Sequence, residues 1–265
     1  MTLSTTDRMI AEKDGAIGWI TFNNPARHNA VSMAMWQALF DIVTDYGSDD
    51  AIRVIVVKGA GDKAFVSGAD ISEFEEKRSS PETTRVYYET SHRATSALKN
   101  VDKPTIAMIR GYCIGGGVST ALACDLRIAA DGAKFGVPAA KLGLGYEYDG
   151  VRTLMDVVGP SFAKEIFFTA RQFAAQEALA MGLVNRVLPD AQLEAFVRDY
   201  AATIAANAPL TVASIKTIVA QALKDESARD NALCEQVVGR CFGSADYVEG
   251  RQAFMEKRQP KFTGR

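Results

Sequence analysis

Short apolar runs divide the first half of the chain at intervals. Four of them, at 16–22, 54–57, 104–109 and 126–130, have the length and composition of strands. The run at 54–57 is apolar at every position, which is typical of a strand buried on both faces of a parallel sheet. These runs predict a sheet whose strands are contributed one at a time along the chain.

Segments with the apolar spacing of helices lie between these runs. Ser32 belongs to a residue type that caps helix N-termini, and the apolar residues after it recur at i, i+3, i+4 and i+7 until Gly47. These apolar residues are Trp36, Leu39, Phe40 and Val43. A second helix is expected over 117–124, where it opens on glycines. The order of strand, helix and strand predicts an α/β core with parallel neighbours.

Strand patterns largely stop near residue 150. Helical segments broken by glycine and proline are predicted at 161–168, 174–181, 190–206, 209–224 and 244–257, with one further strand at 183–187. The pattern therefore predicts an α/β core over residues 1–200 and a helical region over residues 201–265.

Composition narrows the class of protein. The 265 residues are 48% hydrophobic and 23% charged, as in a globular protein, and 30 Lys and Arg against 32 Asp and Glu leave a net charge of −2. The sequence shows no excess of basic residues of the kind that binds nucleic acid. It also shows no apolar run of roughly 18 residues, the length that a membrane-spanning helix requires. Four scattered cysteines, two histidines and no secretory signal predict a cytoplasmic protein without a metal site.

Two turns combine glycine with the end of a predicted strand. Ala64–Asp70 follows the strand at 54–57, and Gly111–Gly117 follows the strand at 104–109 and opens a helix. Because glycine allows close backbone approach and helix N-termini present unpaired N–H groups, the two turns can donate to one developing oxyanion. Alternatively, the glycines serve only helix–strand packing and Asp70 only caps a helix. No dinucleotide or P-loop glycine pattern is present.

Six stretches carry a family resemblance in chain order. They are Asn24–Ala30, Ala64–Ile71, Gly111–Gly117, Ala123–Ala129, Ala178–Asn185 and Glu249–Arg258. Together they resemble the crotonase (enoyl-CoA hydratase/isomerase) superfamily. The resemblance implies a spiral of ββα units with a helical C-terminal region that assembles homotrimers, often paired into hexamers. It also implies an acyl-CoA thioester substrate of fatty acid metabolism, with coenzyme A (CoA) entering as part of the substrate and no separate cofactor.

The same resemblance assigns roles to residues. The two amides that polarise the thioester carbonyl fall on Ala69 and Gly116, in agreement with the glycine turns. The residues expected to contact CoA are Arg27, Ser67, Gly68, Asp70, Ile71 and Lys257. Hydratases of the family use two glutamates as acid and base, and these positions are Ser119 and Ala139 here. Hydration by the usual route is therefore not expected.

Ionisable groups gather instead in the loop between Gly145 and Gly150. Tyr146 falls where methylmalonyl-CoA decarboxylases of the superfamily place a tyrosine, although those enzymes have histidine at Ala69 and glutamate at Ser119. Glu147 or Asp149 is the alternative, as a relocated base for hydratase or isomerase chemistry. Two other interpretations stay open: a solvated loop whose carboxylates cap the next helix near Arg152, and a catalytically silent acyl-CoA-binding protein.

Overall fold

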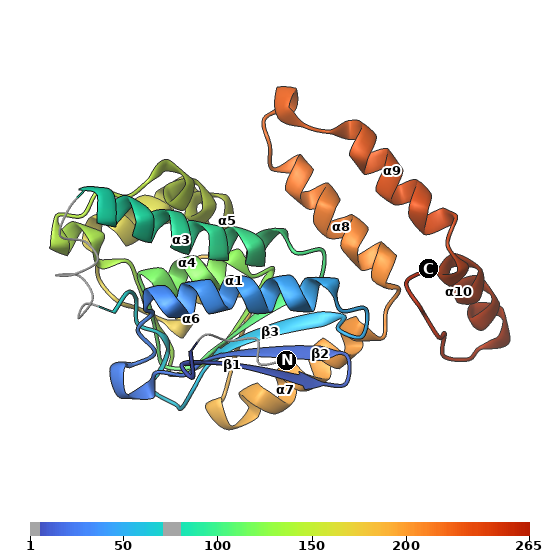
Figure 1. Ribbon diagram of the computed structural model, residues 1–265, viewed down its shortest axis with the longest axis horizontal. Coiled ribbons are helices and arrows are strands. Elements are labelled where there is room, and N and C mark those ends of the chain that lie inside the picture. Colours follow the sequence, from blue (N-terminus) through green and yellow to red (C-terminus); the bar gives the residue numbers. More distant parts are fainter. Residues whose placement is uncertain (1–5, 71–80) are drawn as a thin grey trace.

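The computed structural model describes residues 6–70 and 81–265, and two sheets form its centre (Figure 1). The larger sheet has the order β1 (Met9–Asp14), β2 (Ile17–Phe22), β3 (Val54–Gly59), β5 (Thr105–Ile109), β7 (Leu126–Ala130), β10 (Arg186–Leu188). The smaller sheet has the order β4 (Ala64–Val66), β6 (Tyr112–Ile114), β8 (Lys134–Gly136), β9 (Phe173–Ala174). Only the pairs β1–β2 and β8–β9 are antiparallel among the described strands.

The chain alternates between the two sheets before each helix. β3 and β4 precede α3 (Pro81–Asn100), β5 and β6 precede α4 (Gly116–Ala123), and β7 and β8 precede α5 (Tyr148–Thr169). The first strand of each unit joins the larger sheet and the second joins the smaller one. The α/β class and the spiral of ββα units are therefore confirmed.

Each face of the larger sheet has its own apolar core. On one face α1 (Met33–Ser48) packs with α3 over β2, β3 and β5, through side chains that include Trp36, Leu39 and Leu98. On the other face α7 (Asp190–Ala205) covers the same strands (Figure 1). The predicted division at residue 200 falls inside α7, whose Ala201 and Ala205 still pack on the sheet.

The last three helices extend away from the sheets (Figure 1). They are α8 (Pro209–Ala222), α9 (Asn231–Phe242) and α10 (Ala245–Glu256). The Lys216 ammonium holds α8 to the Asp125 carboxylate at 2.8 Å, and Arg53 donates to the Phe262 carbonyl at 2.5 Å near the C-terminus. Large apolar side chains on these helices are exposed, among them Ile215, Val219, Phe242, Val248 and Phe254.

Most predicted elements occur where the pattern placed them. The four strands are confirmed, and the Ser32 hydroxyl caps α1 by accepting from the Met35 amide at 3.3 Å. The helix predicted at 161–168 is confirmed as the second part of α5, which follows a kink at the non-helical Gly159 (φ 76°). The first part of α5, which begins at Tyr148, was not predicted. The segment at 174–181 forms α6 (Ala175–Ala180). The strand predicted at 183–187 overlaps β10 only at residues 186 and 187, because residues 183–185 form no strand.

No single described helix has the length and apolar composition to cross a membrane. The pair α7 and α8, bent by 101° between them, meets those two criteria only when both helices are counted together.

Gly117 sets the distance between α4 and β4. A Cβ at this position would lie 2.1 Å from the Val66 carbonyl oxygen, so alanine must push the helix and strand apart. We predict that Gly117→Ala lowers the free energy of unfolding by about 1–3 kcal/mol in urea denaturation. Gly132→Ala, where a Cβ meets nothing within 4 Å, should stay within about 0.5 kcal/mol of the parent. Equal stability of the two variants would contradict this account.

Candidate active site

The parallel pairing of β4 with β6 brings the turns that follow these strands together. Ala64 pairs with Tyr112 and Val66 with Cys113, so the carboxyl ends of both strands lie at the same edge. A Cβ at Gly116 would lie 3.7 Å from the Gly68 Cα, which is van der Waals contact between the two turns. Gly68 (φ 113°) and Gly115 (φ 54°) take backbone conformations that only glycine adopts readily.

Two amides in these turns have no acceptor within the described part of the chain. Val31 donates to the Gly68 carbonyl at 2.9 Å and accepts from the Asp70 amide at 3.0 Å. Because this parallel bridge uses the groups on either side of Ala69, the Ala69 N–H points away from it. The Gly116 N–H is at the first position of α4, where no intrahelical acceptor exists. Both residues line one pocket.

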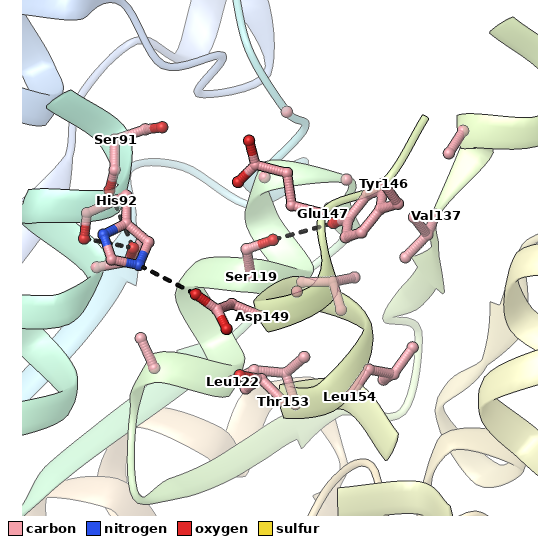
Figure 2. Close-up of a pocket in the computed structure, with 18 of the residues that line it drawn as sticks. Ser91, His92, Ser119, Leu122, Val137, Tyr146, Glu147, Asp149, Thr153 and Leu154 are labelled. Carbon is pink, nitrogen blue, oxygen red and sulfur yellow. Dashed lines mark hydrogen bonds and ion pairs between the residues drawn. The ribbon is translucent and has the colours of Figure 1, made fainter. Parts of the chain in front are cut away.

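The pocket has a volume of about 580 Å³ and lies between α3, α4 and α5 (Figure 2). Its apolar walls are formed by Trp36, Val118, Leu122, Val137, Leu154 and Phe167. Ala139, where the family resemblance led us to expect a glutamate position, is a buried part of this wall and supplies no acid or base. The pocket therefore pairs an apolar interior with two backbone donors at one end, as ligand sites commonly do.

Tyr146 reaches into the pocket and meets Ser119. Their hydroxyl oxygens are 3.2 Å apart (Figure 2), and the Tyr146 ring packs edge-on against Phe167 with 4.8 Å between centroids. Gly150 leaves room for the ring, because a Cβ there would lie 2.6 Å from it. Burial raises the pKa of the Tyr146 phenol, and the hydrogen bond with Ser119 partly opposes that rise. Tyr146 is therefore a neutral hydroxyl at physiological pH.

The two loop carboxylates have different surroundings. Asp149 Oδ2 lies 3.9 Å from His92 Nε2 on α3, and Figure 2 shows this pair spanning the pocket. The Glu147 carboxylate lines the pocket without a hydrogen bond or ion pair to the described residues. Glu147 immediately precedes α5 but its side chain makes no capping bond, and Arg152 pairs with Asp156 instead. The interpretation of this loop as solvated is confirmed, because the Glu147 and Asp149 side chains are exposed. Capping of α5 by the Glu147 carboxylate is not observed.

The residues expected to contact CoA are dispersed. Ser67 and Gly68 line the pocket beside Ala69, while Asp70 is buried and binds the Arg27 guanidinium at 2.8 and 3.1 Å. Lys257 ends α10, outside the pocket lining. Ile71 lies outside the described residues.

Sequence reasoning missed the wall that α3 provides. Tyr87, Tyr88, Ser91 and His92 line the pocket, and the Trp36 indole donates to the Tyr87 hydroxyl at 3.0 Å. No helix was predicted over this mostly polar segment, so none of its residues was a candidate. The Ser119–Tyr146 contact joins positions 27 residues apart and left no local signal.

Ultraviolet difference titration tests the setting of Tyr146. Because burial raises its pKa, the difference between the parent and Tyr146→Phe should show tyrosinate only above the ordinary pH of about 10. Because the folded-state pKa of Tyr146 lies above its unfolded-state value, this difference contributes to the free energy of unfolding. The contribution is fully present below about pH 10 and is lost as the pH rises through the folded-state pKa. In Ser119→Ala the ionisation should move higher still, since a bond that lowers the pKa is removed. Ionisation at or below pH 10 would disprove this setting.

Comparisons with known proteins cover almost the whole chain. The profile of the family described as Enoyl-CoA hydratase/isomerase matches residues 12–265. The short-chain-enoyl-CoA hydratase of Clostridium acetobutylicum is 32% identical over 253 residues, with 96% of each chain covered. The crotonyl-CoA hydratase of Syntrophomonas wolfei is 33% identical over 256 residues, covering 97% of this chain and 98% of the relative. A crystal structure of an enoyl-CoA hydratase/carnithine racemase from Magnetospirillum magneticum is 36% identical with a TM-score of 0.94, covering 99% and 98%.

Proposed function

The chain belongs to the enoyl-CoA hydratase/isomerase family, and from this premise we propose that it stabilises the enolate of an acyl-CoA thioester. The observation that carries the proposal is the pair of unpaired amides, Ala69 and Gly116, lining one pocket. A thioester oxygen that accepts from both becomes more negative as the enolate forms. Loss of one such donor typically costs about 3 kcal/mol of transition-state stabilisation.

Acid and base are supplied by the loop before α5 in this proposal. Ser119 and Ala139 leave the family's two glutamate positions without a carboxylate. The free Glu147 carboxylate is the base that removes the proton from the α-carbon, and Asp149 is the second candidate for this role. The neutral Tyr146 hydroxyl, held by Ser119, is the acid that returns a proton to carbon. This supports hydratase/isomerase-type chemistry by an atypical route.

A second candidate reaction is decarboxylation of a malonyl- or methylmalonyl-type CoA ester. The specific observation in its favour is that the Tyr146–Ser119 pair brings two neutral hydroxyls together in the pocket. Loss of CO₂ produces the enolate without a base, so hydroxyls suffice to orient the carboxylate and reprotonate carbon. The remaining alternative, a silent acyl-CoA-binding protein, requires only the pocket and its amides.

Substrate binding and assembly complete the proposal. We assign the CoA moiety to the side of the pocket formed by Ser67 and Gly68, with Arg27 and Asp70 fixing that turn. No separate cofactor is proposed. The exposed apolar side chains of α8, α9 and α10 support association into a trimer or a hexamer, in which Lys257 would contact CoA across an interface.

Exchange of the α-proton of a saturated acyl-CoA with deuterated water tests enolate formation. Mass spectrometry should show deuterium uptake by the parent, and Glu147→Gln should slow it at least about 100-fold, because the base is lost. Glu12→Gln, which changes an exposed carboxylate on β1, should exchange at the parental rate. Parental exchange in Glu147→Gln transfers the role to Asp149, and exchange that also survives in Asp149→Asn refutes the relocated base.

Crotonyl-CoA hydration should be very slow, although the protein binds acyl-CoA, since both usual glutamates are replaced. Incubation with methylmalonyl-CoA, with CO₂ loss detected by mass spectrometry, distinguishes a decarboxylase from a hydratase/isomerase and from a silent acyl-CoA-binding protein. Rapid hydration of crotonyl-CoA by the purified protein would refute the proposed departure from the family's usual chemistry.

A further inference from the structure

Two polar stripes line the pocket and run from its catalytic end toward its far end. On α3 the stripe consists of His92, Ser96 and Lys99, and on α5 it consists of Asp149, Thr153 and Asp156. Both follow the spacing i, i+4, i+7, which places side chains on one face of a helix. All six residues line the same pocket as Ala69 and Gly116.

The floor between the stripes is α4. This helix begins at Gly116, beside the paired amides, and ends at Ala123, which also lines the pocket. The rise of an α-helix makes this distance about 10 Å. An acyl group held at the amides therefore meets apolar side chains such as Val118 and Leu154 first, and polar side chains at its far end.

At the far end of the pocket, the acidic side chains have partners and one basic side chain has none among the described residues. Each aspartate of the α5 stripe has a partner: Asp149 faces His92 at 3.9 Å, and Asp156 accepts from Arg152 at 2.8 Å. The Lys99 ammonium has no hydrogen bond or ion pair with the part of the chain that the structure describes, although it lines the pocket. The Asn100 side-chain amide beside it is likewise unbonded there.

We propose that this far end binds the terminal carboxylate of a dicarboxylic acyl-CoA, with Lys99 as the cation and Asn100 as a hydrogen-bond donor. The assignment rests on the proposed function, because the thioester must be anchored at Ala69 and Gly116. The charges at this end favour an anionic ligand, because both aspartates of the α5 stripe face a basic side chain and the donors of Lys99 and Asn100 remain. An alkyl chain of equal length would remove water from Ser96 and Thr153 without replacing their hydrogen bonds.

Calorimetric titration with adipoyl-CoA and hexanoyl-CoA tests this assignment, because the two share chain length and differ in the terminal carboxylate. The parent should bind adipoyl-CoA roughly fivefold more tightly, the range of a solvent-accessible ion pair. Lys99→Met should abolish the preference by weakening adipoyl-CoA alone. The preference should also shrink at high salt.

Lys164→Met serves as the matched control, since Lys164 is exposed on α5 and does not line the pocket; it should keep the parental preference. Equal binding of both thioesters by the parent would overturn this inference while leaving the proposed function intact. A preference that persists in Lys99→Met would also overturn it. If neither thioester bound, the proposed function itself would fail, and the inference with it.

Discussion

Two peptide N–H groups, which find no acceptor among residues 6–70 and 81–265, are the constraint around which the rest of this structure is arranged. Unpaired backbone donors are costly unless a ligand or water meets them. Here Ala69 and Gly116 present such donors, on turns that β4 and β6 hold in contact by parallel pairing. The alternation of strands between two sheets is what makes that pairing possible, because each ββα unit returns a strand to the smaller sheet.

In the proposed reaction, the acid and the base come from a different part of the pocket than the two glutamates expected from the family resemblance. α4 and the segment at Ala139 contribute a hydroxyl and a methyl group, whereas the loop leading into α5 contributes Tyr146 and Glu147. In this proposal the scaffold tolerates the change because the amides assigned to the thioester oxygen belong to the backbone. Side chains around them can change without moving the oxyanion site, so one fold supports several reactions of an enolate.

The periodicity of apolar residues predicted the helices and strands that pack against a core. It missed the short strands that form only by pairing with other strands. The run at 54–57 and the Ser32 cap were readable because burial and local hydrogen bonding determine them. β4, β6 and β8 have three residues each, too few to show a period. The glycine turns were predicted from local conformation, but the Ser119–Tyr146 contact depends on how α4 and α5 pack and has no local signature.

The most direct measurement is amide NMR of the isotopically labelled protein with two matched ligands, an acyl-CoA thioester and the CoA thioether that lacks its carbonyl oxygen. Hydrogen bonding to that oxygen should shift the Ala69 and Gly116 amide protons downfield with the thioester and not with the thioether. Other pocket amides, such as that of Leu122, should respond alike to both. Identical shifts of Ala69 and Gly116 with the two ligands would contradict the account.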